Sequence, residues 1–212
     1  MKKRELLFCD VETTGLSADD EVLELALVTG DEKIIFNRRF GTVARRIWTQ
    51  AENIHGISPE DVNNLQPLNC FEDQLRELTR DHDVIFYNAA YDTKYLGKCL
   101  DPSCRIFCAM LTHDRMFQRR KLMQTLDDHG IPRNDLTAHS AADDCTATAR
   151  LWKFMRTQPH FKPVRFFPQS YNHICRRDNN EQNSTLIIVA TVIIAAVLFI
   201  ISTLILASLF TP

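Results

Sequence analysis

The sequence predicts an α/β domain with a mixed sheet, followed by a linker and an apolar C-terminal segment. Three early strand-like runs form a meander, and later apolar runs alternate with helical patterns, which is typical of a mixed sheet flanked by helices. The length, 212 residues, allows one domain and an appendage. The 25 Lys and Arg and the 27 Asp and Glu residues all precede residue 182, so the net charge of −2 averages two different parts.

Five strands and four helices are expected in the charged part. The strands are short apolar runs rich in β-branched residues, and a Gly-Asp turn at residue 30 joins the second to the third. They cover residues 6–12, 21–29, 33–40, 83–88 and 105–109. Helical periodicity covers residues 71–80, 91–99, 121–129 and 141–155, and Gly130 and Pro132 end the third helix. The prediction is therefore a five-stranded sheet.

The expected domain organisation is a domain over residues 1–158, a linker over 159–184 and a transmembrane helix over 185–210. Pro159, Pro163 and Pro168 exclude a regular helix from the linker, and residues 178–184 are strongly polar. Aromatic and basic residues alternate between positions 161 and 177. This mixture suits contact with anionic lipid or single-stranded nucleic acid, but packing of the aromatics on the domain is the favoured interpretation.

Residues 186–210 contain only Thr and Ser as polar members. As a helix this stretch would span roughly 37 Å, enough to cross about 30 Å of hydrocarbon. A buried core helix is the alternative, but such helices are seldom apolar on every face. The N-terminal apolar run, residues 6–9, is too short for a signal peptide. We therefore expect a single-pass C-terminal membrane anchor with the catalytic domain facing the cytoplasm.

Acidic residues recur at three places in the predicted domain. Asp10 and Glu12 lie two positions apart on a predicted strand, so both side chains leave the same face. Asp92 follows the strand that ends at residue 88, and Asp144 follows His139 at the start of the last helix. Taken alone, Asp92 could be an acid at a helix N-terminus, and His139 could be a structural histidine. Two like charges on one strand face need a cation or water, and the joint pattern of the three places favours a metal site.

These motifs resemble those of the DEDDh exonucleases, the DnaQ-like 3′–5′ exonuclease superfamily that includes the exodeoxyribonuclease X and three-prime repair types. The pattern D-x-E-T-T-G is complete at residues 10–15, and H-x-A-x-x-D stands at 139–144. The pattern H-N-A-x-F-D is present at 87–92 with Tyr87 and Tyr91 in place of His and Phe. Residues 53–58 are similar to an I-H-G-I-T segment. The resemblance covers roughly residues 4–155 and implies an RNase H-like fold.

The resemblance also implies the roles of individual residues. Two Mg²⁺ or Mn²⁺ ions would be held by the carboxylates of Asp10, Glu12, Asp92 and Asp144, which are the hard oxygen donors such ions prefer. His139, five positions before the last Asp, would be the catalytic base. The implied substrate contacts are Thr13, Gly15, Leu16, His55, Asn88 and Tyr91.

The function we expect is that of a membrane-tethered, metal-dependent 3′–5′ exonuclease releasing nucleoside monophosphates from single-stranded DNA. An exoribonuclease of the same chemistry is one alternative, because the motifs do not select the sugar. A catalytically idle, membrane-tethered nucleic-acid-binding module is another. The expected partners are nucleic acid, DNA ahead of RNA, a membrane and, since some relatives are dimers, a second copy. Basic clusters at 38–39, 45–46 and 119–121 could attract nucleic acid locally, although solvated faces explain any one of them.

Overall fold

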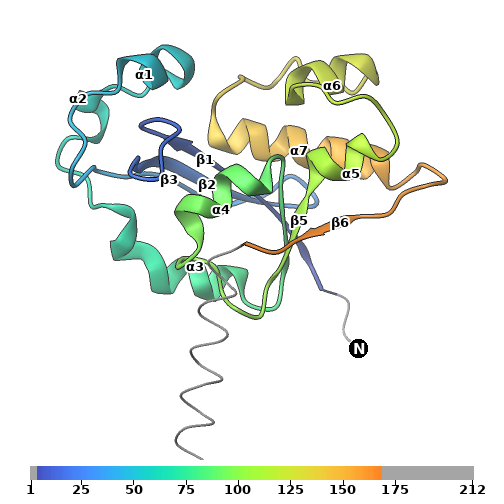
Figure 1. Ribbon diagram of the computed structural model, residues 1–212, viewed down its shortest axis with the longest axis horizontal. Coiled ribbons are helices and arrows are strands. Elements are labelled where there is room, and N and C mark those ends of the chain that lie inside the picture. Colours follow the sequence, from blue (N-terminus) through green and yellow to red (C-terminus); the bar gives the residue numbers. More distant parts are fainter. Residues whose placement is uncertain (1–3, 169–212) are drawn as a thin grey trace, which may run out of the picture. The chain divides into compact units, whose positions relative to one another are not determined.

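The computed structural model describes residues 4–168 of the chain, and these residues form a mixed sheet with helices on both faces (Figure 1). The sheet has six strands within this range. In sheet order they are β3 (Ile34–Arg39), β2 (Val22–Thr29), β1 (Leu6–Thr13), β4 (Asp83–Phe86), β5 (Arg105–Cys108) and β6 (Val164–Phe166). The strands β1, β4 and β5 are parallel, whereas β2, β3 and β6 run antiparallel to their neighbours. The carboxyl ends of β1, β4 and β5 therefore share one edge of the sheet.

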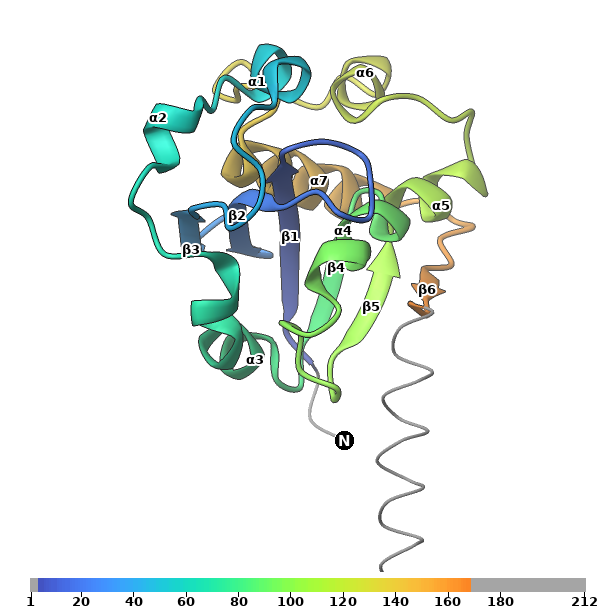
Figure 2. The same cartoon turned by 60° about the vertical axis from the view of Figure 1, so that its left-hand side comes forward.

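The alternation of side chains along the strands builds two cores. Phe8 and Ile85 point to one face, where they pack against α7 (Ala141–Met155) and α6 (Leu122–Asp128). Cys9 and Val84 point to the other face, toward α3 (Glu72–Thr79) and α4 (Ala89–Leu96). Figure 2 shows α7 behind the strands and α4 in front of them. Because Asp10 and Glu12 continue the series of Phe8, they emerge on the α7 face.

Short helices occupy the connections between these elements. Helices α1 (Thr49–His55) and α2 (Pro59–Val62) and a 3₁₀ turn, η1 (Leu68–Phe71), lie between β3 and α3. Helix α5 (Ala109–Asp114) follows β5 without an intervening loop. The sequence prediction missed these four elements, because runs of four to seven residues are too short for a helical period to show.

The mixed α/β architecture is confirmed, but the predicted number of strands is wrong. The sixth strand, β6, falls inside the range 159–184 that was expected to be a linker. Proline excludes a helix there but tolerates a short edge strand, and Pro163 and Pro168 flank β6 without interrupting it. The N–H of Val164 donates to Thr112 Oγ1 at 3.0 Å, and Phe161 packs edge-on against Trp152 with ring centroids 5.4 Å apart. The described fold thus continues past residue 158.

Helix α4 begins at Ala89, two residues before the expected start, because β4 ends at Phe86 and not at residue 88. Asp92 consequently lies within the first turn of the helix. The transmembrane helix expected over residues 185–210 lies outside the described residues. Among residues 4–168, no helix combines the length and the apolar character needed to span a membrane.

The contact between Phe161 and Trp152 gives a test of how far the folded domain extends. We expect Phe161→Ala to lower the free energy of unfolding by about 2 kcal/mol, since a half-buried aromatic ring is lost from the α7 face of the sheet. Phe167→Ala is the matched control, because that ring is 63% exposed, and it should change stability by less than about 0.5 kcal/mol. Urea denaturation of the two variants measures the difference, and equal effects would contradict the assignment of Phe161 to the core.

Candidate active site

Asp10 and Glu12 lie near the carboxyl end of β1. In the pairing with β2, Asp10 stands opposite Ala26 and Glu12 stands opposite Glu24. The register shifts between Glu12 and Thr13, so the strand bends just after the second acid. Glu12 is only 9% exposed, and Glu24 opposite it is equally buried. The strand therefore holds two carboxylates at the sheet edge where β4 also ends.

Asp92 reaches this edge from the other side of the sheet. It lies in the first turn of α4, which begins three residues after β4 ends. Because β4 is parallel to β1, α4 starts beside the carboxyl end of β1. Asp92 is 2% exposed, and backbone hydrogen bonds, one of them from Val11, partly compensate the burial of its carboxylate.

Asp144 and His139 come from the amino end of α7. Asp144 is in the first turn of that helix, and its backbone N–H donates to Ser140 O at 2.9 Å. His139 is in the preceding loop with a φ of 63°, a left-handed conformation that costs energy for a residue other than glycine. Ligand atoms of Glu12, His139 and Asp144 all lie within 4.8 Å of one another. In this loop conformation the exposed imidazole of His139 lies beside the carboxylates of Glu12 and Asp144.

Burial and mutual repulsion make these acids hard to ionise. Burial, followed by the charge of Asp144, raises the pKa of Glu12 to about 8. Burial likewise raises the pKa of Asp92 to about 8 and that of Asp144 to about 7. The pKa of Asp10 is also raised well above its usual range, by burial and then by the charge of Asp92. Within residues 4–168 no Lys or Arg forms an ion pair with any of the four.

This donor set fits divalent metal ions. Carboxylate oxygens of Glu12 and Asp144 converge with an imidazole nitrogen of His139, a group that does not include Asp10 or Asp92. Among residues 4–168 no Lys or Arg pairs with these acids, and Mg²⁺ or Mn²⁺ would satisfy such an environment. When bound, such ions would stabilise negative charge on a phosphodiester and activate water. Asp10, Glu12, Asp92 and Asp144 would hold the ions, and His139 is placed at the rim, where it could accept a proton.

Of the six expected substrate contacts, Leu16 is the most accessible, with 79% of its surface exposed in the loop after β1. Thr13 and Tyr91 are engaged with each other: their hydroxyl oxygens are 2.5 Å apart, and Thr13 also donates to Gly15 O. Asn88 is half-buried at the start of α4, and its side chain makes no capping hydrogen bond. Leu16 and Asn88 therefore remain available to a ligand.

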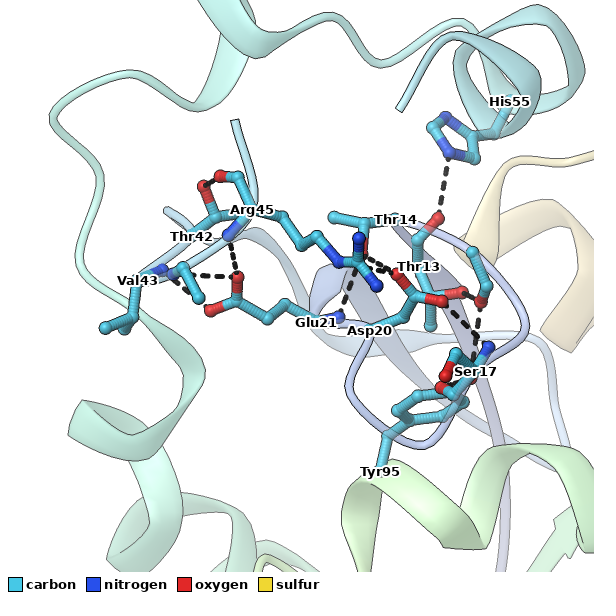
Figure 3. A network of polar contacts seen from close by, with 12 residues as sticks. Thr13, Thr14, Ser17, Asp20, Glu21, Thr42, Val43, Arg45, His55 and Tyr95 are labelled. Atoms are coloured by element: carbon cyan, nitrogen blue, oxygen red, sulfur yellow. Dashed lines mark hydrogen bonds and ion pairs between the residues drawn. The ribbon is translucent and has the colours of Figure 1, made fainter. Parts of the chain in front are cut away.

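His55 has a structural role in the described residues. Its Nδ1 accepts the N–H of Ile57 at 3.0 Å, so its Nε2 carries the proton and donates to Thr13 O at 3.2 Å. Burial lowers the pKa of this imidazole, which favours the neutral form that both hydrogen bonds require. His55 thus ties α1 to the end of β1 (Figure 3). A contact to substrate through its ring nitrogens would have to replace one of these bonds.

Sequence reasoning missed a fifth acid, Glu24. This residue is 9% exposed, lies opposite Glu12, and accepts the N–H of Ala141 at 3.3 Å. It thereby links β2 to the first residue of α7. The signal was present in the sequence: a lone Glu within the apolar run Val22–Thr29 needs a buried partner.

Comparison with known proteins agrees with this geometry. The sequence profile described as RNase_T: Exonuclease matches residues 7–152, and the chain belongs to this exonuclease family. The uncharacterized exonuclease CP81 of Escherichia phage 186 is 26% identical over 163 residues, which cover 67% of this chain and 83% of CP81. The α/β fold and the carboxylate site therefore belong to a nuclease.

Two solved structures are similar in fold. Exonuclease X in complex with 5′ overhanging duplex DNA has a TM-score of 0.57 and 25% identity, over 72% of this chain and 92% of that one. The nuclease domain of 3′hExo, a DEDDh family member bound to rAMP, has a TM-score of 0.61 and 13% identity, over 76% and 96%. The second likeness concerns the fold alone. Together with the family match, these neighbours support the expected DEDDh superfamily and the RNase H-like sheet.

The raised pKa values predict an unusual dependence of stability on pH in metal-free protein. In the unfolded chain the pKa of a carboxyl group is about 4, whereas in the folded chain the pKa values of Glu12 and Asp92 are about 8. Between these values the folded state binds more protons, so the free energy of unfolding falls as pH rises. We expect a loss of about 2 kcal/mol or more from pH 5 to pH 8 in EDTA, and recovery with Mn²⁺ at pH 8.

Urea denaturation at the two pH values measures this effect. Glu12→Gln should reduce the loss, because it removes one buried acid, while the exposed Glu60→Gln should leave it unchanged. Metal-free stability that is flat between pH 5 and pH 8 would contradict the electrostatic description of the site.

Proposed function

We propose that the protein is a metal-dependent 3′–5′ exonuclease that releases nucleoside monophosphates, with single-stranded DNA as its favoured substrate. The observation that carries the proposal is the convergence of Glu12, His139 and Asp144 within 4.8 Å at the edge of an exonuclease fold. Members of the family use divalent metals, and the four carboxylates would hold two of them. The complex of exonuclease X with DNA supports DNA as the substrate.

Three elements would supply the metal ligands, with Asp92 coming from α4. The strand β1 contributes Asp10 and Glu12 as fixed metal ligands, and α7 contributes Asp144 together with the loop of His139. An imidazole in an exposed loop can approach the attacking water and then release its proton to solvent. The exposed Leu16 would contact the terminal base of the strand, and Asn88 would help to orient the scissile phosphate.

Asp144 and its neighbour Asp143 provide a matched test of activity. Asp144→Asn should lower the rate of digestion by roughly 100-fold or more. Removing a metal ligand should reduce activity at least as strongly as removing a group that orients such a ligand. Asp143→Asn should retain most of the activity, since an amide oxygen can also accept the N–H of Thr137, which Asp143 accepts at 2.9 Å. The variant also removes a charge that raises the pKa of Asp144, and this change leaves the metal ligand itself in place. His139→Ala should lower the rate by about 10²–10⁴-fold with Mg²⁺ or Mn²⁺ present.

The assay compares single-stranded DNA, duplex DNA and RNA labelled at either end. A 3′–5′ enzyme shortens a 5′-labelled strand to a ladder and releases the label of a 3′-labelled strand at once as a mononucleotide. Faster digestion of RNA than of DNA would favour the exoribonuclease alternative. Full activity in Asp144→Asn, or activity in EDTA, would overturn the proposed mechanism.

We further propose that the protein is tethered to a membrane through residues 185–210, with the nuclease domain on the cytoplasmic side. The support is the uncharged apolar sequence of residues 186–210 alone. The full chain should co-sediment with lipid vesicles and resist extraction by carbonate, whereas a variant with Ile194→Asp and Val197→Asp should remain in the supernatant. The sequon at Asn183 should stay unglycosylated in a eukaryotic expression host. Equal sedimentation of both proteins, or glycosylation of Asn183, would contradict this topology.

A further inference from the structure

Residues 42–47, between β3 and α1, form an irregular segment with an unusual surface. Val43 is 65% exposed and Ile47 is 77% exposed, and both arginines between them, Arg45 and Arg46, are also exposed. We name this stretch the basic segment. Exposed aliphatic side chains beside unburied arginines are a combination that suits a ligand with both charge and apolar surface.

Both ends of the basic segment are fixed to the domain. On one side, the N–H of Gly41 donates to Gln66 O at 3.1 Å, and a Cβ at position 41 would lie 2.1 Å from Leu65 O, so only glycine fits. On the other side, Trp48 is buried, and its indole N–H donates to Ile57 O at 2.8 Å. The exposed side chains therefore project from a backbone that is held at both ends.

Glu21 fixes the middle of the basic segment. Its carboxylate accepts the backbone N–H groups of Val43, Ala44 and Arg45, at 2.6, 3.0 and 2.7 Å (Figure 3). Three hydrogen bonds to one charged acceptor determine the path of these residues. Glu21 directly precedes β2, whose Val22 stands opposite Thr13. The basic segment consequently lies at the edge of the sheet that carries Asp10 and Glu12.

Asp20 joins the basic segment to the loop that carries Leu16. Its carboxylate lies 3.1 Å from Arg45 Nε and accepts the hydroxyl of Thr14 at 2.9 Å and the N–H of Ser17 at 2.8 Å. A Cβ at Gly15 would lie 2.6 Å from Asp20 Oδ2, so the loop closes tightly over this carboxylate. Figure 3 shows the carboxylate of Asp20 facing both Arg45 and Thr14. The two loops are thus held together on one side of the carboxylate site.

Arg46 remains free of an acidic partner. Among the described residues it forms no ion pair, and its guanidinium contacts only Val43 O, at 3.5 Å. We propose that the basic segment binds the nucleic-acid strand upstream of the scissile 3′ end. Arg46 would contact phosphates, while Val43 and Ile47 would pack against bases and sugars. This inference rests on the proposed exonuclease function and assigns the site that would hold the rest of the substrate.

The test measures binding of a fluorescent ten-nucleotide oligothymidylate to the full chain in detergent, with Ca²⁺ replacing Mg²⁺. We expect Arg46→Glu to raise the Kd about 10-fold and to reduce the slope of log Kd against log salt by about 1. Ile47→Ser should raise the Kd about 5-fold, a loss of about 1 kcal/mol. In digestion assays with the metal restored, Arg46→Glu should raise KM more for the ten-nucleotide substrate than for a dinucleotide.

Two matched controls lie at the opposite end of the domain. Arg156→Glu makes the same charge reversal at the carboxyl end of α7, roughly 20 Å along the helix from the carboxylates. Ile34→Ser removes an aliphatic side chain that is 52% exposed at the far end of β3. Both controls should bind the oligonucleotide within about 2-fold of the unmodified chain.

The outcomes separate this proposal from the proposed function. If Arg46→Glu and Arg156→Glu bind the oligonucleotide equally, the basic segment is not the binding surface, even when the unmodified chain digests DNA. If binding depends on Arg46 but no oligonucleotide is digested, the binding surface stands and the exonuclease activity is refuted.

Discussion

The repulsion among buried carboxylates at the end of β1 is the constraint on which the rest of the site depends. Asp10, Glu12, Asp92 and Asp144 come from three elements and lie where burial disfavours their charge. The four acids stay close together although their ionisation is unfavourable, because the two cores hold β1, α4 and α7 in place independently of the site. The hydrophobic packing therefore holds the acids in position for a cation, at a cost to the stability of the metal-free protein.

The loop that carries Leu16 and the basic segment lie beside the site and are held in place by hydrogen bonds. Asp20 and Glu21 act as internal acceptors and fix two loops through backbone and arginine donors. The carboxylates of the site and those of the loops differ in environment. Within residues 4–168 the first group forms no ion pair with Lys or Arg, while both carboxylates of the second group accept hydrogen bonds. Asp and Glu residues thus serve two purposes here, as candidate metal ligands at the site and as hydrogen-bond acceptors that fix the loops.

The sequence was sufficient to predict the long elements and the acidic motifs. Residues 141–155 were predicted as a helix with the bounds that α7 has, because fifteen residues show a clear period and a turn precedes them. Short elements were not predictable in this way, and β6 illustrates the reason. A three-residue edge strand is specified by the free edge of β5 and by the packing of Phe161, both of which are tertiary contacts. The apolar run around Glu24 signals a buried acid, but its contact could not be predicted, because Ala141, whose N–H it accepts, is distant in sequence.

The small buried side chains of α7 determine how far the helix lies from the sheet. Ala141, Ala142 and Ala149 are almost fully buried, and α7 packs against β1 and β2, so the helix axis lies close to these strands. A larger side chain at any of these positions would move α7 outward and carry Asp144 and His139 away from Glu12. Small side chains in the core of α7 thereby set the spacing of a site that they do not themselves line.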